Sequence, residues 1–107
     1  MAVILTDDSN FETTVSQQPL VIVKYYADWC GSCKLFAPKY KRLSNDERFQ
    51  TIAFIEVNAE TSPEARKRGA VNNLPTFAIF KNGEMLASLS TSKEEAVVAL
   101  LEQLQAY

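Results

Sequence analysis

The segment LVIVKYYADWCGSCK, residues 20–34, joins an apolar run to the only two cysteines of the chain. Residues 20–27 are β-branched and aromatic with little alternation, which is typical of a central strand covered on both faces. A helix is expected after the strand, so the cysteines lie where the two elements meet. Lys24 interrupts the apolar run, and a charged residue in a buried strand needs an explanation.

Length and composition favour a single globular domain over residues 1–107. The chain is 47% hydrophobic and 22% charged, which suits one modest core. A net charge of −2 with no histidine gives no basic surface for nucleic acid. No span approaches the ~20 apolar residues that cross a bilayer, and the amino terminus lacks the pattern of a secretion signal. We therefore expect a cytoplasmic protein that binds no membrane. The sequence carries no oligomeric signal, and we expect a monomer.

Hydrophobic periodicity predicts alternating strands and helices on both sides of the central strand. Pro38 should kink the helix after the cysteines, and Asn82-Gly83 favours a tight hairpin turn. The first helix should open at Thr6, Asp7 or Asp8, and Ser92 and Glu95 are spaced as a capping box for the last one. The other expected strands are 3–5, 51–57, 76–80 and 85–90, and the expected helices are 6–17, 32–46, 62–70 and 91–107.

The predicted element order, βαβαβαββα, indicates an α/β fold with a mixed five-stranded sheet covered by helices on both faces. We expect strands separated by helices to be parallel and the terminal hairpin to be antiparallel. Ligands and chemistry in such sheets gather at the carboxyl ends of the parallel strands. Trp29 and Cys30 lie at that end of the central strand.

Two thiols separated by two residues at the start of a helix can cycle between dithiol and disulfide without refolding. Cys30 would lie at the helix amino terminus, where free amides and the macrodipole stabilise a thiolate. Cys33, one turn further in, should be more buried and closer to neutral. Cys30 would therefore attack a substrate disulfide and Cys33 would resolve the mixed disulfide, while Gly31 lets the substrate chain approach.

Other uses of two cysteines are less consistent with this sequence. A zinc site within one chain needs four ligands, and the chain has no histidine to complete one. An iron–sulfur cluster fails on the same count unless two chains share it. Hydrolysis by a cysteine nucleophile usually needs a basic partner such as histidine. Two ordinary cysteines close together by chance remain an alternative, which the preceding strand and following helix weaken.

The segments ADWCGSCK (27–34) and NNLPTFAIFKNGE (72–84) resemble the active site and the proline loop of the thioredoxin family. The element order resembles this family over essentially the whole chain. The resemblance implies a dithiol–disulfide oxidoreductase that reduces protein disulfides, binds no cofactor and draws electrons from an NADPH-linked thioredoxin reductase.

The resemblance also implies roles for residues around the cysteines. Trp29 would flank the site, and Pro75 would follow a cis peptide bond and lie against the disulfide. The backbone near Leu74 and Thr76 would then pair with an extended substrate segment. Without the resemblance, Pro75 would be only a proline at the start of a strand.

The sequence departs from the family pattern near the site. Ser32 stands where the family usually has proline, which restores an amide and adds a hydroxyl near the sulfurs. The reduction potential should shift, in a direction the sequence leaves open. The segment 85–93 is shorter than its family counterpart and lacks a glycine, which leaves partner choice open.

The third departure is Lys24, because thioredoxins carry a buried aspartate there, thought to help deprotonate the resolving cysteine. Glu56 stands where the family has a lysine, so the two charges have changed places. An unpaired buried charge costs roughly 3–5 kcal/mol, so we expect Lys24 to pair with Glu56. Lys24 would then stabilise the Cys33 thiolate while Glu56 accepts its proton. Alternatively, Lys24 extends to solvent and Glu56 merely faces water.

Two other functions remain open from the sequence. A thiol oxidase or isomerase is compatible with serine at position 32. A non-catalytic binding module would hold a partner on the face around Trp29 and Pro75, with its thiols incidental.

Overall fold

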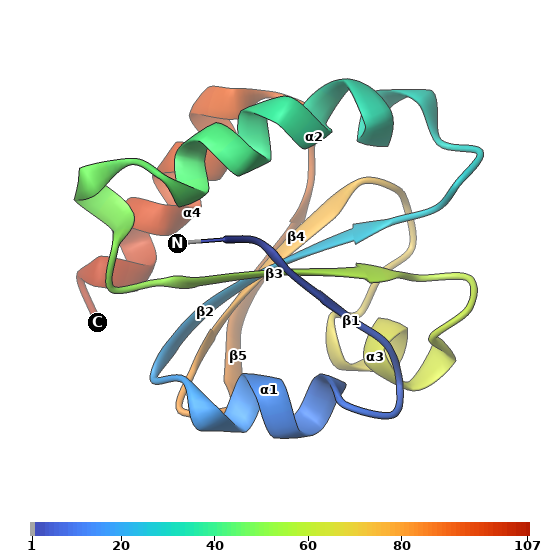
Figure 1. Ribbon diagram of the computed structural model, residues 1–107, viewed down its shortest axis with the longest axis horizontal. Helices are drawn as coiled ribbons and strands as arrows, with labels where there is room; N and C mark the ends of the chain where they lie inside the picture. Colours follow the sequence, from blue (N-terminus) through green and yellow to red (C-terminus); the bar gives the residue numbers. More distant parts are fainter. Residues whose placement is uncertain (1) are drawn as a thin grey trace.

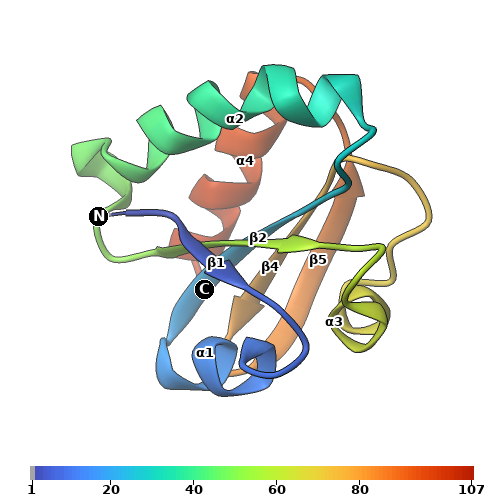
Figure 2. The same cartoon turned by 45° about the vertical axis from the view of Figure 1, so that its right-hand side comes forward.

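The computed structural model describes residues 2–107 and contains one five-stranded sheet in the order β1-β3-β2-β4-β5. Helices α2 and α4 cover one face of the sheet, and α1 and α3 cover the other (Figures 1 and 2). The predicted element order is confirmed. The elements are β1 (Ile4–Thr6), α1 (Phe11–Gln17), β2 (Leu20–Tyr26), α2 (Gly31–Ser44), the 3-10 turn η1 (Glu47–Phe49), β3 (Ala53–Asn58), α3 (Pro63–Arg68), β4 (Thr76–Lys81), β5 (Glu84–Ser90) and α4 (Glu94–Gln105). Within residues 2–107, no helix is both long and apolar enough to span a membrane.

Strand β4 runs antiparallel to β2, so the expectation that all strands separated by helices are parallel is wrong there. Only β1, β3 and β2 are mutually parallel. The reason is the length of α3, which has 6 residues and so rises only about 9 Å. A strand as long as β4 spans about 20 Å, so α3 is too short to carry the chain back to the end of the sheet at which β3 begins. Strand β4 therefore begins beside the carboxyl end of β2, which brings Thr76 opposite Tyr25.

Strand β2 is buried on both faces, as its sequence predicts. Val21, Val23 and Tyr25 pack in the core under α1 and α3. Ile22 packs in the second core, under α2 and α4. Side chains alternate along a strand, so Lys24 faces the same side as Ile22. The lysine is therefore directed into an apolar layer.

The helix starts differ from the predicted ones. Helix α1 begins at Phe11, later than expected, because residues 7–10 form a turn in which Asp7 accepts the amide of Ser9. Asp8 instead reaches across the fold to α3 and accepts the amides of Glu64 and Ala65 at 3.1 and 2.9 Å. These bonds satisfy two of the free amides at the start of α3.

The capping box predicted from Ser92 and Glu95 is wrong. The residue before α4 is Lys93, and its side chain makes no capping bond. The chain turns into α4 through Thr91, whose hydroxyl accepts the amide of Lys93 at 3.1 Å.

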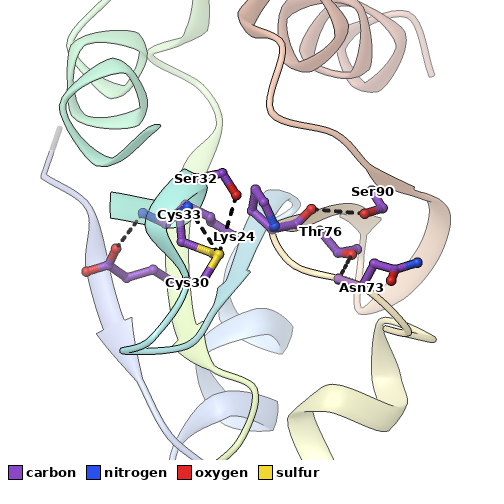
Figure 3. The surroundings of a disulfide bond; sticks show 9 residues. Lys24, Cys30, Ser32, Cys33, Asn73, Thr76 and Ser90 are labelled. Atoms are coloured by element: carbon purple, nitrogen blue, oxygen red, sulfur yellow. Dashed lines mark hydrogen bonds and ion pairs between the residues drawn. A yellow bond between two sulfur atoms is a disulfide. The ribbon is translucent and has the colours of Figure 1, made fainter. Parts of the chain in front are cut away.

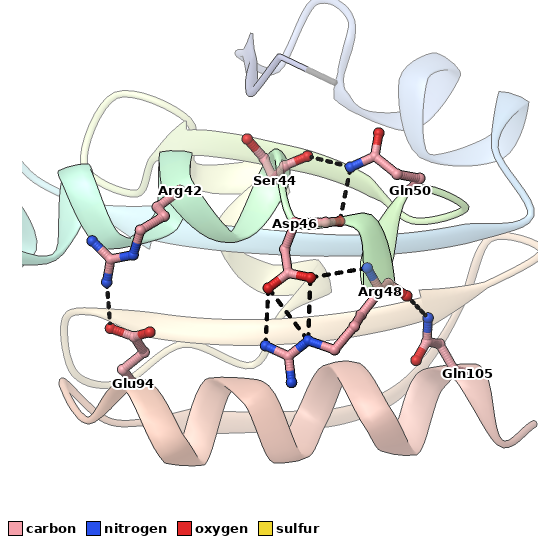
Figure 4. A network of polar contacts seen from close by, with 7 residues as sticks. All are labelled: Arg42, Ser44, Asp46, Arg48, Gln50, Glu94 and Gln105. Atoms are coloured by element: carbon pink, nitrogen blue, oxygen red, sulfur yellow. Dashed lines mark hydrogen bonds and ion pairs between the residues drawn. The ribbon is translucent and has the colours of Figure 1, made fainter.

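Polar contacts join α4 to the last turn of α2 and to the segment that follows it (Figure 4). Arg42 and Glu94 form an ion pair at 2.8 Å near the start of α4. At its other end, the side chain of Gln105 donates to the carbonyl of Arg48. Exposed ion pairs contribute only about 0–1 kcal/mol, so these contacts orient α4, whose attachment depends on its buried leucines.

Gly69, at the end of α3, is required because a side chain at this position would clash with its surroundings. A Cβ atom on Gly69 would lie 2.5 Å from Cε2 of Tyr25. Gly69 has an ordinary φ of −95°, whereas its neighbour Ala70 has the left-handed φ of 52°. Position 70 has the φ value that favours glycine, yet it holds alanine. Position 69 has an ordinary φ value but holds glycine, because the ring of Tyr25 leaves no room for a side chain there.

We expect opposite effects from substituting these neighbours. Gly69→Ala should lower the free energy of unfolding by about 1–3 kcal/mol, because the methyl group overlaps a buried ring. Ala70→Gly should raise it by roughly 0.5–1 kcal/mol, because glycine adopts a positive φ without steric cost. Urea unfolding of both variants measures the difference, and equal changes of the same sign would contradict this account.

Candidate redox-active site

A disulfide joins Cys30 and Cys33 at the first turn of α2, with their Cα atoms 5.3 Å apart (Figure 3). Cys30 is the N-cap of the helix, and its sulfur accepts the backbone amide of Cys33 at 3.2 Å. This amide is one of the free donors of a helix start, and it would stabilise a thiolate at Cys30 in the reduced protein. The expected position of Cys30 at the helix amino terminus is confirmed.

The two sulfurs differ less in burial than expected. Cys30 is 4% exposed and Cys33 is 2% exposed, so both are buried. Their difference lies in the helix-start amide, which reaches only Cys30. Trp29 beside them is 67% exposed, and apart from its chain neighbours and the backbone of α2, no atom lies within 4 Å of where a Cβ on Gly31 would be. The surface at Trp29 and Gly31, on either side of Cys30, is therefore open.

Leu74 and the loop before β4 complete one flank of the disulfide. Leu74 packs against the cluster of Ala27, Cys30 and Cys33, and its peptide bond to Pro75 is cis. Thr76 is buried and donates its hydroxyl to the carbonyl of Asn73 (Figure 3).

The shortened segment 85–93, which includes most of β5, reaches this loop directly. The carbonyl of Pro75 accepts the amide of Thr91 and the hydroxyl of Ser90, both at 3.3 Å. The sequence drew attention to the length of this segment but not to these two bonds. They tie the end of β5 to the residue after the cis bond.

Lys24 and Glu56 form an ion pair across neighbouring strands, with 3.5 Å between Nζ and Oε2. Their Cα atoms are direct partners in the β2–β3 register. The Lys24 side chain is only 3% exposed and that of Glu56 is 30% exposed. The alternative in which Lys24 extends to solvent is therefore wrong, whereas Glu56 does remain in contact with water.

Two tyrosines that the sequence analysis did not single out enclose the Lys24 ammonium. Nζ lies 5.6 Å from the ring centroid of Tyr26 and 5.5 Å from that of Tyr40. Aromatic faces attract a cation at such distances, so the rings partly replace the lost water. Tyr26 could have been found, because it lies two residues after Lys24 and thus on the same face of β2.

Burial governs the ionisation of this cluster. It lowers the pKa of Lys24, and the neighbouring Glu56 carboxylate offsets part of that effect. The pKa of Tyr40 is raised well above its usual value, first by burial and then by Glu56. Tyr40 thus stays a neutral hydroxyl, placed within 2.8 Å of the carbonyl of Ile55.

A cavity of about 210 Å³ lies between the ion pair and Cys33. Lys24, Glu56 and Cys33 all line it, together with Ala37 of α2. The cavity is large enough for several waters, and its polar groups offer them partners. Water in this cavity would therefore be within reach of both Cys33 and Glu56.

Metal chemistry has no support among residues 2–107. No group of three histidine, cysteine, aspartate or glutamate side chains in this part of the chain is arranged to hold a metal ion.

A disulfide at the first turn of a helix and at the end of a central strand, with Leu74 of the loop before β4 packed against it, is the arrangement of a thiol–disulfide oxidoreductase. The thioredoxin family model matches residues 2–103. Thioredoxin 1 of Plasmodium falciparum is 33% identical over 103 residues, covering 96% of this chain and 97% of that protein. The chain therefore belongs to the thioredoxin family, and with its Cys30–Cys33 pair it is a dithiol–disulfide oxidoreductase.

Solved structures agree with this assignment. The structure of Plasmodium falciparum thioredoxin superposes with a TM-score of 0.84 at 31% identity, covering 96% of this chain and 98% of that one. Spinach chloroplast thioredoxin f gives a TM-score of 0.88 at 21% identity, covering 97% of this chain and 94% of that one, which shows likeness of fold alone.

The sequence is also similar to part of a larger protein. Human protein disulfide-isomerase A4 is 29% identical over 103 residues, and that match covers only 16% of it.

The ion pair predicts a double-mutant result. Lys24→Asp should destabilise the protein by about 3–5 kcal/mol, because it puts two acids side by side in a buried layer. Combining it with Glu56→Lys should recover much of that loss, since the opposite charges are restored. Urea unfolding of the wild type, both single variants and the double variant measures the coupling, and additive losses would show that the two residues do not interact.

Proposed function

We propose that residues 1–107 act as one thioredoxin-like domain that reduces disulfides in other proteins, with Cys30 attacking and Cys33 resolving. The observation that supports these roles best is the amide of Cys33, which donates to Cys30 Sγ at 3.2 Å. A donor aimed at one sulfur favours the thiolate of that cysteine, and the thiolate is the nucleophile in disulfide exchange.

The proposed reaction transfers two electrons to the substrate in two exchanges. The Cys30 thiolate attacks one sulfur of the substrate disulfide, forms a mixed disulfide and releases the other substrate sulfur as a thiolate, which takes a proton from water. Cys33 then loses its proton and attacks Cys30 Sγ. The second substrate thiolate leaves and is protonated, and the Cys30–Cys33 disulfide remains.

The substrate would lie over the open surface around Cys30 as an extended segment pairing with the backbone of the loop before β4. The exposure of Trp29 and the free space above Gly31 support this placement. The proposed contact residues are Trp29, Gly31, Ser32, Leu74, Pro75 and Thr76.

Lys24 and Glu56 would act in the second exchange. The Lys24 ammonium stabilises the developing Cys33 thiolate, and Glu56 accepts the proton through water in the shared cavity. Glu56 suits this task because its side chain is 30% exposed and can pass the proton on to solvent. The site would thus use a buried cation where other thioredoxins use a buried acid.

An NADPH-linked thioredoxin reductase would return the Cys30–Cys33 disulfide to the dithiol, and the protein would act as a cytoplasmic monomer without a bound cofactor. Family membership supports a reductase as the electron donor in general terms. The similarity to one part of human protein disulfide-isomerase A4 supports isomerase activity as the second candidate.

Trapping tests the assigned roles. Cys33→Ser should accumulate mixed disulfides with a disulfide-containing test substrate such as insulin, because no second thiol resolves them. Cys30→Ser should form none. Turnover of insulin reduction should fall at least about 10³-fold in either variant, since each removes an essential thiol. Mass spectrometry of the trapped species identifies the sulfur involved. If both cysteine variants keep a partner with undiminished affinity and the wild type never reduces insulin, the protein is a binding module.

Lys24 should also affect the rate of the second exchange. Lys24→Met should slow release of substrate from the mixed disulfide by about tenfold at neutral pH, because the Cys33 thiolate loses a neighbouring cation. Rapid-quench measurement of single turnovers across neutral pH gives this rate. Lys67→Met, which removes a lysine that is 76% exposed on α3, is the matched control. An unchanged rate in Lys24→Met would mean that the ion pair serves stability only.

A further inference from the structure

Tyr40 of α2 is bonded to both strands that carry the ion pair. Its hydroxyl lies 2.8 Å from the carbonyl of Ile55 on β3 and 3.1 Å from the carbonyl of Ile22 on β2. A phenol has a single hydrogen to donate, so the two carbonyls share it. Only 1% of Tyr40 is exposed. The ring is therefore held at a fixed position against the two strands.

The Lys24 ammonium has few other fixed contacts. An ammonium has three hydrogens to donate, and within residues 2–107 Lys24 forms one ion pair, at 3.5 Å to Glu56. Its four-carbon stem is flexible, so this pair alone leaves the ammonium several positions. The rings of Tyr40 and Tyr26, with centroids 5.5 and 5.6 Å from Nζ, restrict them. Tyr26 is half-buried, so Tyr40 is the more firmly held of the two.

We propose that Tyr40 is a positioning residue, whose ring holds the Lys24 ammonium beside the cavity that Cys33 lines and so supports the second thiol exchange. This inference rests on the proposed role of Lys24 in stabilising the Cys33 thiolate. It adds to the site a residue two helical turns away from the resolving cysteine.

The same helix carries Tyr40 and the resolving cysteine. Cys33 precedes Tyr40 by seven residues, so the two buried side chains lie on the same face of α2. The rings of Phe54 and Phe77, with centroids 5.2 and 5.7 Å from that of Tyr40, pack against it from the sheet. Tyr40 therefore fixes where α2, with Cys33, lies relative to β2, with Lys24.

Tyr40 also separates the ammonium from a larger hollow. This hollow of about 610 Å³ lies between α2 and the amino-terminal segment and is lined by Tyr40, whereas Lys24 and Cys33 line the cavity of about 210 Å³. Without the ring, water in the larger hollow would reach the ammonium. A charge in water acts more weakly on its neighbours than one in an apolar layer, so the effect of Lys24 on Cys33 would weaken.

Two substitutions and a control separate the ring from the hydroxyl. Tyr40→Leu removes the ring and opens the hollow, whereas Tyr40→Phe keeps the ring and removes only the hydroxyl. The matched control is Phe49→Leu, which truncates another fully buried ring of the same core, in η1.

Ellman's reagent measures the second exchange without a protein substrate. The Cys30 thiolate of the reduced protein attacks the disulfide of the reagent, releases one thionitrobenzoate and forms a mixed disulfide with the other. Cys33 then loses its proton, attacks Cys30 Sγ and releases the second thionitrobenzoate, which leaves the Cys30–Cys33 disulfide. Stopped-flow absorbance gives the rate of the second release.

Tyr40→Leu should slow the second release about fivefold at neutral pH, which is the scale of one desolvated contact between a cation and a ring. Tyr40→Phe and Phe49→Leu should stay within about twofold of the wild-type rate, because both keep that contact. The midpoint of the pH–rate profile, which reports the ionisation of Cys33, should rise in Tyr40→Leu. The titratable groups that face Cys33 across the cavity are the same in these three variants, and they are Lys24, Tyr26, Asp28, Lys34 and Glu56.

A double variant tests whether Tyr40 acts through Lys24. Adding Tyr40→Leu to Lys24→Met should change the rate by less than about twofold, because the ammonium to be positioned is already gone. A purely structural role of Tyr40 would slow both backgrounds equally.

The wild type offers a test that depends on no variant. The ε-methylene protons of Lys24 should be shifted upfield in NMR spectra, because the faces of two rings lie beside the ammonium. Ordinary lysine shifts would overturn the inference, even if Tyr40→Leu failed to fold.

The inference is also overturned if Tyr40→Leu has the wild-type rate, if Tyr40→Phe is as slow as Tyr40→Leu, or if Tyr40→Leu slows both backgrounds equally. Slow release in Lys24→Met with a wild-type rate in Tyr40→Leu leaves the proposed function intact and removes the role of Tyr40. An unchanged rate in Lys24→Met removes the roles of both residues. If the wild type reduces no insulin, the proposed reductase function fails, and the thionitrobenzoate rates still decide the role of Tyr40.

Discussion

The antiparallel pairing of β2 with β4 is the contact on which the site depends. It places Thr76 opposite Tyr25, at the end of β2 from which the chain enters α2 with its two cysteines. The proline loop and the disulfide therefore meet at one edge of the sheet although more than a third of the chain separates them. The shortness of α3 makes the pairing possible, and the carboxylate of Asp8, bound to the first amides of α3, anchors that helix.

The sequence predicted those parts of the fold that depend on local chemistry. The β-branched and aromatic residues of the segment 20–27, interrupted by Lys24, predicted a strand buried on both faces, and Asn82 and Gly83 have the positive φ values of 52° and 84° that a tight turn needs. Prediction from the sequence failed where contacts between distant residues determine the structure. The direction of β4 follows from the span of α3 against the sheet, and the cap of α3 comes from Asp8, a residue more than fifty positions away.

The same distinction applies to the residues of the site. Spacing identified Cys30 and Cys33, and the cost of a buried charge, together with the family resemblance, selected Glu56 as the partner of Lys24. The sequence alone could not reveal that Tyr40 of α2 would stand beside the Lys24 ammonium, because that contact depends on how a helix packs on the sheet. Nor could it tell that the Ser32 hydroxyl lies 3.5 Å from Cys30 Sγ, since that depends on the rotamers in one helical turn.

The buried ion pair also constrains how this chain can have diverged from its relatives. Exchanging an acid and a lysine between two facing strands takes two substitutions, and either one alone leaves like charges together in an apolar layer. Such an intermediate would be purged by its instability, because most proteins hold only about 5–15 kcal/mol in reserve. A lineage could cross this barrier through a neutral residue at one of the two positions. Sequences that carry a neutral residue at position 24 or 56 would then mark a route by which the polarity of such a pair can reverse.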